Sequence, residues 1–177
     1  ESTHLTDVRS LAGLTQLHSL NLFGTDIVDV SSLAGLTQLQ NLDLWYTRVT
    51  DGSSLAGLTQ LQTLDMSHAP LTNMSFFTSL TELLTLHLCG SPATDVRFLA
   101  GLTQLQTLDL GYSIHLTDVS SLASLQQLQT LGLNHTSLID VSALASTTQL
   151  HTLNLNCTSV VDVSSLVGLS QLQTLNL

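Results

Sequence analysis

Residues able to do chemistry gather between positions 65 and 109 of the 177-residue chain. Asp65, His68, His87, Cys89 and Asp109 offer the oxygen, nitrogen and sulfur atoms that bind zinc, and a Cys beside a His can form a thiol nucleophile. The stretch has no Cys-x-x-Cys spacing, however, and acidic neighbours raise the pKa of a thiol. The pattern therefore favours neither a metal site nor an enzyme, and we expect no cofactor.

The charge of the chain limits the kinds of partner that it can bind. The chain carries 3 Arg, no Lys and 13 acidic residues, which gives a formal net charge of −10. This balance excludes nucleic-acid binding through a basic patch and disfavours docking on anionic membranes. No apolar run reaches the roughly 18 residues of a membrane span. We expect a protein partner, no nucleic acid and no membrane insertion.

A short repeat organises the elements that must position these side chains. The phrase Leu-x-x-Leu-x-Leu, with Met66 last in the third copy, starts at Leu17, Leu39, Leu61, Leu83, Leu105, Leu128, Leu150 and Leu172. The spacing is constant except for one extra residue between Leu105 and Leu128. Leucines at alternate positions predict a short strand with one buried face, and a fixed period of about 22 residues indicates a solenoid. We expect one domain over residues 1–177, with about eight turns of roughly 22–23 residues.

A column of carboxylates stands at one position of every repeat. Asp and Asn there can accept hydrogen bonds from the free N–H groups that open a short helical turn, so we interpret the column as a structural capping ladder. A calcium site would need six to eight oxygen atoms converging on one point, which a linear ladder does not supply. The ladder consists of Asp7, Asp29, Asp51, Asn73, Asp95, Asp118, Asp140 and Asp162.

The repeat consensus, Leu-x-x-Leu-x-Leu-x-x-Thr-x-Val-x-Asp-Val-x-x-Leu-x-x-Leu-x-x, resembles the leucine-rich repeat superfamily in its short, internalin-like class. It differs by placing Thr or Ser where internalins mostly have Asn. The consensus is also similar to that of trypanosomatid leucine-rich repeat proteins, some of them described as adenylate cyclase regulators. The resemblance implies an α/β-type solenoid, mostly strand and 3₁₀ helix. It would be a right-handed coil with a parallel concave sheet of about eight short strands and convex 3₁₀ turns.

Neither end of the chain shows a capping motif. Repeat arrays need terminal units with polar outer faces, because an end unit lacks a neighbour on one side. We therefore expect the chain to be a piece of a longer protein, or to have its ends covered by a partner or by end-to-end self-association.

The residues predicted to face outward along the sheet vary most between repeats, so they are the candidates for recognition. One column is Phe23, Trp45, Ser67, Cys89, Gly111, Asn134 and Asn156, and the next, at the strand exit, is Gly24, Tyr46, His68, Gly90, Tyr112, His135 and Cys157. Exposed aromatic residues beside charges are typical of binding hot spots. Single exposed apolar residues are also common on surfaces without a partner. The predicted partner-binding residues are Phe23, Asp43, Trp45, Tyr46, Asp65, His68, His87, Asp109 and Tyr112.

These features predict a non-enzymatic protein-binding module that uses its concave sheet. The alternatives are a structural spacer or assembly solenoid, and a regulatory domain of a signalling enzyme such as adenylate cyclase. The sequence leaves the compartment open. Cys89 and Cys157 lie three coils apart, roughly 14 Å, beyond disulfide reach, and free thiols favour a reducing compartment. Three glycosylation sequons, at Asn73, Asn134 and Asn156, point the other way.

Overall fold

Each repeat forms one short strand and one 3₁₀ turn. A computed structural model describes residues 4–177, and within them eight strands alternate with eight 3₁₀ helices. The strands are β1 (Ser19–Asn21), β2 (Asn41–Asp43), β3 (Thr63–Asp65), β4 (Thr85–His87), β5 (Thr107–Asp109), β6 (Thr130–Gly132), β7 (Thr152–Asn154) and β8 (Thr174–Asn176). The 3₁₀ helices are η1 (Arg9–Gly13), η2 (Ser31–Gly35), η3 (Ser53–Gly57), η4 (Ser75–Ser79), η5 (Arg97–Leu99), η6 (Ser120–Ser124), η7 (Ser142–Ser146) and η8 (Ser164–Gly168).

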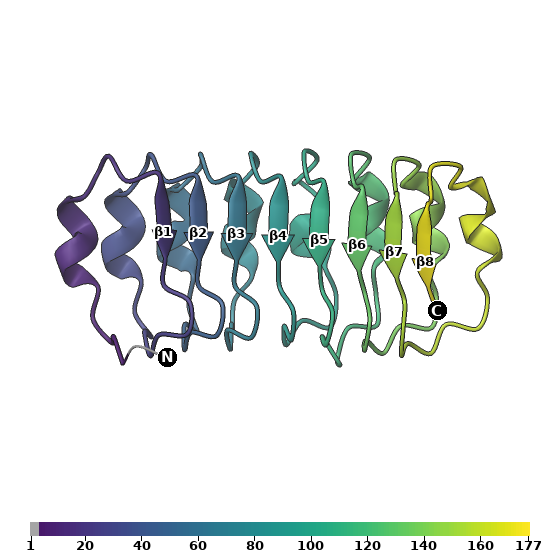
Figure 1. The fold of residues 1–177 in the computed structure, drawn as a ribbon, viewed down its shortest axis with the longest axis horizontal. Coiled ribbons are helices and arrows are strands. Elements are labelled where there is room, and N and C mark those ends of the chain that lie inside the picture. Colours follow the sequence, from purple (N-terminus) through teal and green to yellow (C-terminus); the bar gives the residue numbers. More distant parts are fainter. Residues whose placement is uncertain (1–3) are drawn as a thin grey trace.

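The strands form one open parallel sheet in sequence order, with the 3₁₀ helices on the opposite side of the coil (Figure 1). Every strand residue pairs with its equivalent in the next repeat, as Leu42 does with Leu64 and Leu64 with Leu86. The one longer repeat takes up its extra residue in a loop, where the Ile114 N–H donates to the Tyr112 carbonyl (3.0 Å), and Thr107 still pairs with Thr130. The predicted sheet and 3₁₀ turns are confirmed.

The core is a stack of leucine layers between the sheet and the 3₁₀ helices. The central leucine of each inner strand is buried, and the leucines of η2, η3, η6 and η7 are buried behind it. Thr25, Thr47 and Thr136 also point inward, and each hydroxyl donates to the carbonyl three residues earlier (2.7–2.8 Å). These bonds satisfy the three buried hydroxyls, so threonine is tolerated beside the leucine layers.

The first and last coils bury less than the inner ones. No residue of η1 is buried, and all three residues of β8 are exposed. Each of these coils stacks on a neighbour on one side only, so its outer face has no cover in the described residues. No helix among residues 4–177 is long and apolar enough to cross a membrane.

Aromatic residues replace the consensus in the fourth and fifth coils. Phe76 and Phe77 of η4 lie with their ring centroids 4.2 Å apart, and the ring of Phe98 in η5 is 5.4 Å from that of Phe77. Phe77 takes a position that is Leu in other repeats, and Phe76 and Phe98 take a Ser position. Helix η5 is also the shortest, at three residues. The packing of these coils therefore differs locally from the rest of the array.

Candidate partner-binding surface

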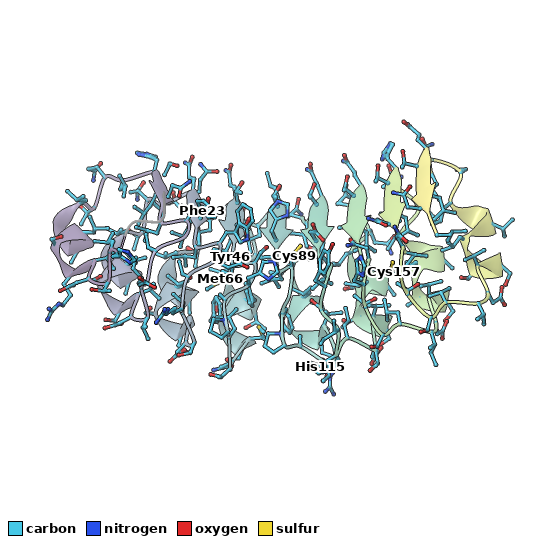
Figure 2. The ribbon with its side chains drawn as sticks, turned by 60° about the horizontal axis from the view of Figure 1, so that its bottom comes forward. Phe23, Tyr46, Met66, Cys89, His115 and Cys157 are labelled. Carbon is cyan, nitrogen blue, oxygen red and sulfur yellow. The ribbon has the colours of Figure 1, made fainter. Side chains whose placement is uncertain are left out.

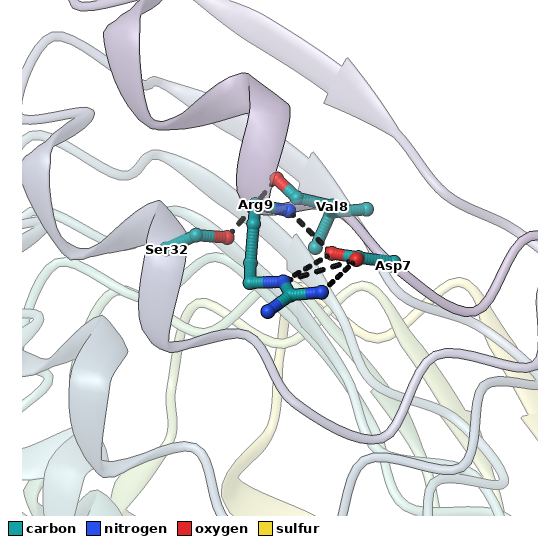
Figure 3. Close-up of polar contacts among 4 residues, drawn as sticks. All are labelled: Asp7, Val8, Arg9 and Ser32. Carbon is teal, nitrogen blue, oxygen red and sulfur yellow. Dashed lines mark hydrogen bonds and ion pairs between the residues drawn. The ribbon is translucent and has the colours of Figure 1, made fainter.

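The capping ladder lies at the start of the 3₁₀ helices, away from the sheet. In every repeat the side-chain Oδ1 accepts a hydrogen bond from the backbone N–H two residues later, at 2.7–3.1 Å, as Asp7 does from Arg9 (Figure 3). Asn73 makes the same bond as its carboxylate neighbours. The ladder thus supplies acceptors to N–H groups that open each helical turn.

The same contacts set the charge state of the ladder. Hydrogen bonds from the Arg9 side chain and backbone lower the pKa of Asp7 to about 2. The Arg97 side chain, followed by its backbone N–H, lowers the pKa of Asp95. For Asp29 and Asp162 the backbone N–H of the following serine is the main cause of a lowered pKa. These carboxylates therefore carry negative charge throughout the neutral range.

A second column, at the strand exits, has an unusual backbone conformation. Its members all have positive φ, between 56° and 68°: Gly24, Tyr46, His68, Gly90, Tyr112, His135 and Cys157. Left-handed backbone is disfavoured for residues with a Cβ atom. Here it turns the chain so that the N–H of Tyr46 donates to the Ser67 carbonyl (3.0 Å) and the N–H of Tyr112 to the Asn134 carbonyl (2.8 Å). The column contains Gly-Tyr-His twice and then Cys. Because the backbone N–H groups of Tyr46 and Tyr112 bond to the next coil, their aromatic rings stand on a backbone that is held in place.

Replacing Cys157 with Gly is expected to raise the free energy of unfolding by about 0.5–1 kcal/mol. The left-handed conformation costs a non-glycine residue about 1–2 kcal/mol, and the greater chain entropy of glycine offsets part of that gain. Cys157 is exposed, and its thiol contacts the adjacent Asn156 side chain (3.3 Å). Calorimetry should show a melting temperature higher by about 2 °C.

The matched control is Gly24→Ala, at the first position of the same column. Gly24 has φ 65°, and an added Cβ would meet no atom within 4 Å, so only the backbone conformation is tested. This variant should melt at a lower temperature. A fall in both variants would contradict the strain argument.

An aromatic run extends across the first three coils of the sheet side. The ring centroids of Phe23 and Trp45 are 4.7 Å apart, those of Trp45 and Tyr46 6.3 Å, and those of Tyr46 and His68 5.1 Å. Phe23, Trp45 and Tyr46 are 49%, 40% and 62% exposed. Phe23, Tyr46 and Cys89 follow one another along the array (Figure 2). A second pair, Tyr112 on His135, stacks at 4.5 Å further along.

Two pockets flank the aromatic run. The larger, of about 710 Å³, is called the Arg48 pocket, and the smaller, of about 230 Å³, the Cys89 pocket. The Arg48 pocket is lined by Phe23, Gly24, Thr25, Asp26, Trp45, Tyr46, Thr47, Arg48, His68 and Pro70. The Cys89 pocket is lined by Trp45, Asp65, Ser67, His68, His87, Cys89, Asp109 and Tyr112.

The structure brings eight of the nine predicted partner-binding residues to these two pockets. Phe23 and Tyr46 line the Arg48 pocket, and Asp65, His87, Asp109 and Tyr112 the Cys89 pocket, while Trp45 and His68 line both. Asp43 lines neither. Its carboxylate accepts from the Asn21 side chain and the Trp45 N–H (both 3.0 Å), so it fixes the strand exit beneath the aromatic run.

Two residues predicted to face outward are buried instead. Ser67 is 4% exposed, and its hydroxyl accepts a hydrogen bond from the Cys89 N–H (3.2 Å). Gly111 is buried because the Asn134 side chain of the next coil lies over it, 2.8 Å from where a Cβ would stand. The prediction was wrong at these positions because small residues let neighbouring side chains close over them.

Sequence reasoning missed the polar wall of the Arg48 pocket. Arg48 Nε lies 3.1 Å from Asp26 Oδ1, and His4 Nδ1 lies 3.2 Å from Asp26 Oδ2. Asp26 and Arg48 are opposite charges spaced by one repeat, so they occupy equivalent positions on adjacent coils. The spacing of one repeat between them could therefore have predicted the ion pair of Asp26 with Arg48.

The Cys89 pocket holds a thiol, two imidazoles and two carboxylates. Burial, and next the negative charge of Asp109, raise the pKa of Cys89 to about 12, so its thiol is protonated at neutral pH. No three His, Cys, Asp or Glu side chains in the described part of the chain are grouped closely enough to hold a metal ion. Both cysteines are free, as their spacing predicts.

Comparisons with known proteins agree with this architecture. The family described as "Leucine Rich repeats (2 copies)" matches residues 37–79. Internalin C2 of Listeria monocytogenes is 32% identical, with a TM-score of 0.95 over 98% of this chain and 76% of that one. A Leptospira interrogans leucine-rich repeat protein is 18% identical, with a TM-score of 0.70 over 96% and 51%, and shows the fold alone.

A plant receptor is also similar. The leucine-rich repeat ectodomain of the membrane receptor kinase GASSHO1/SCHENGEN3 of Arabidopsis thaliana, solved in complex with CASPARIAN STRIP INTEGRITY FACTOR 2, is 27% identical. The TM-score is 0.79, over 97% of this chain and 22% of that one. No curated protein sequence matches the chain. The repeat, the open parallel sheet and the likeness to internalin C2 together show that the chain belongs to the leucine-rich repeat superfamily.

Proposed function

We propose that this chain is a non-enzymatic recognition module that binds a protein partner on the outward face of its sheet. The proposal rests on the aromatic run, in which the rings of Phe23, Trp45, Tyr46 and His68 each lie against the next, between two pockets. The plant receptor ectodomain solved with a bound factor supports a binding role for this fold.

The aromatic run is ordered before any partner arrives. Asp43 holds the Trp45 N–H, and the Tyr46 N–H donates across to the Ser67 carbonyl. Each ring also packs against the next, which restricts its side-chain rotation. Aromatic residues ordered in advance lose little entropy on binding and can contribute a large share of the affinity. The surface therefore has the properties of a hot spot.

The test is a peptide selection followed by substitution. Peptides enriched from a random phage-displayed library on the immobilised chain are measured by calorimetry against the chain and the variant Trp45→Ser. Serine is the natural residue of this column in the next coil, at Ser67, so the variant should fold. We expect Kd to rise about 30-fold, the loss of a hot-spot residue worth about 2 kcal/mol.

A second variant, Tyr46→Gly, removes the ring and leaves the backbone conformation that Gly24 and Gly90 adopt in the same column. It should also weaken binding. The control is Ile139→Thr, an exposed residue of the seventh repeat that lines neither pocket and is Thr at the equivalent positions 50 and 72. Peptides that bind both pocket variants with unchanged Kd, or that lose affinity for the control, would refute the placement.

The spacer and assembly interpretation stays a prediction. Association through the first and last coils would make the apparent mass in analytical ultracentrifugation rise with concentration, whereas binding on the sheet face would not. The regulatory-domain interpretation likewise stays a prediction.

A further inference from the structure

The sheet side of the chain carries negative charge that the protein does not neutralise itself. The chain has three arginines and no lysine, and each arginine pairs with a carboxylate elsewhere: Arg9 with Asp7 (2.6 Å), Arg48 with Asp26 (3.1 Å) and Arg97 with Asp95 (2.7 Å). Among residues 4–177, no arginine forms an ion pair with Asp65 or Asp109, the two carboxylates of the Cys89 pocket.

These two carboxylates are held in place by their own strands. Asp65 Oδ1 accepts from the Ser67 N–H (2.8 Å), and Asp109 Oδ1 accepts from the Gly111 N–H (2.9 Å). Their charge acts on the pocket: after burial, Asp109 is the main cause of the raised pKa of Cys89, and Asp65 contributes. A cation entering the pocket would therefore meet fixed negative charges and would not have to order them.

The walls of the same pocket are aromatic. Trp45 lies on one side and Tyr112, 53% exposed, on the other, with His68 and His87 between them along the sheet. Aromatic faces attract cations, and the planar guanidinium group of arginine both stacks on rings and forms paired hydrogen bonds with carboxylates. An aliphatic side chain would bury two carboxylates without supplying a partner for them, which is unfavourable.

We infer that the Cys89 pocket receives an arginine side chain of the protein partner, with the rings of Trp45 and Tyr112 and the carboxylates of Asp65 and Asp109 lining the pocket around it. The volume, about 230 Å³, suits one long side chain and not a folded surface. This inference rests on the proposed function, because it takes the ligand to be a protein and names the side chain that it inserts.

The test uses a defined probe, tetra-arginine amide, with tetra-citrulline amide as its uncharged counterpart of nearly the same shape. Trp45 is the only tryptophan of the chain, so its fluorescence reports directly on the pocket wall. At pH 8 and low salt, tetra-arginine should change this fluorescence saturably, and tetra-citrulline should not.

Asp65→Asn and Asp109→Asn should each weaken tetra-arginine binding at least about 5-fold, a typical loss of one close charge contact. Both should fold, because Asn21 and Asn154 occupy the same column and accept the same local N–H bond (2.9 and 3.1 Å). The control is Asp140→Asn in the capping ladder, which removes one charge far from the pocket. Asn73 shows that asparagine serves there.

Three results would each overturn the assignment of an arginine site. The first is an equal response to the arginine and citrulline peptides, and the second is an equal loss of affinity in the pocket variants and in Asp140→Asn. The third is binding of tetra-lysine that is as tight as that of tetra-arginine. The two proposals fail separately. If selected peptides lose affinity for Trp45→Ser but tetra-arginine shows no pocket-specific binding, the recognition surface stands and the arginine site is wrong. If tetra-arginine binds as described but the selected peptides bind Trp45→Ser with unchanged Kd, the recognition surface is misplaced.

Discussion

Replacing Phe77 with Ala is expected to lower the free energy of unfolding by about 3–5 kcal/mol, the cost typical of a phenylalanine lost from a packed core. Phe77 is fully buried, and its ring contacts those of Phe76 and Phe98, with centroids 4.2 Å and 5.4 Å away. Truncation would leave a cavity between η4 and η5, where the shorter η5 offers little to fill it. Urea denaturation followed by circular dichroism measures the change as a shift of the midpoint.

The matched control is Phe77→Leu, because leucine occupies the equivalent position at Leu33, Leu55 and Leu99. Leucine is smaller than phenylalanine but leaves a much smaller cavity than alanine, so this exchange should cost clearly less than Phe77→Ala. A loss in Phe77→Ala no larger than that in Phe77→Leu would show that the cavity left at this position is not what destabilises the coil.

Replacing Gly52 with Val should cost about 1–3 kcal/mol, although the repeat pattern calls for valine there, as at Val8, Val30 and Val96. A Cβ at Gly52 would lie 2.4 Å from Phe76 Cζ and 2.5 Å from its Cε1, well inside contact distance. The ring of the next coil thus fills the space that a valine fills elsewhere. The same denaturation experiment measures the loss.

The double variant Gly52→Val with Phe76→Ser tests this explanation, since serine is the consensus at position 76, as at Ser32 and Ser54. Removing the ring makes room for the valine, so Gly52→Val should cost far less in this background than alone. Contacting residues show coupling energies of about 0.5–3 kcal/mol in such cycles. Effects that simply add would show that the close approach to Phe76 is not the cause.

The fold could be predicted from the sequence, because the interactions that determine it are local and recur in every repeat. Alternate leucines, such as Leu20 and Leu22, predicted the strands, and the constant spacing of the repeats placed equivalent positions side by side. The acceptor role of Asp29 or Asn73 needs only the N–H two residues later, so each repeat contains the whole interaction. The extra residue between Leu105 and Leu128 was also recognised from the spacing, and the structure places it in a loop near Ile114, outside the strand.

The candidate site was harder to predict from the sequence, because the contacts that shape it are made between side chains of adjacent coils. The residues of the Cys89 pocket were named, but not that Ser67 and Gly111 would be covered by their neighbours. Gly90 illustrates the difficulty: its missing side chain matters because the His68 ring lies 2.5 Å from where a Cβ would stand. Contacts of this kind depend on which residue occupies the equivalent position of the adjacent coil, and a single repeat does not record them.

The uniform register has a genetic consequence. Near-identical phrases, such as those beginning at Leu33 and Leu55, can misalign when their coding sequences recombine, and an unequal exchange between these two would delete one whole repeat. The flanking coils would still meet in register, because every strand presents the same leucines to its neighbour. That one event would remove Asp43, Trp45 and Tyr46 together. The chain can thus lose or duplicate its most distinctive surface in a single heritable step while the solenoid stays intact.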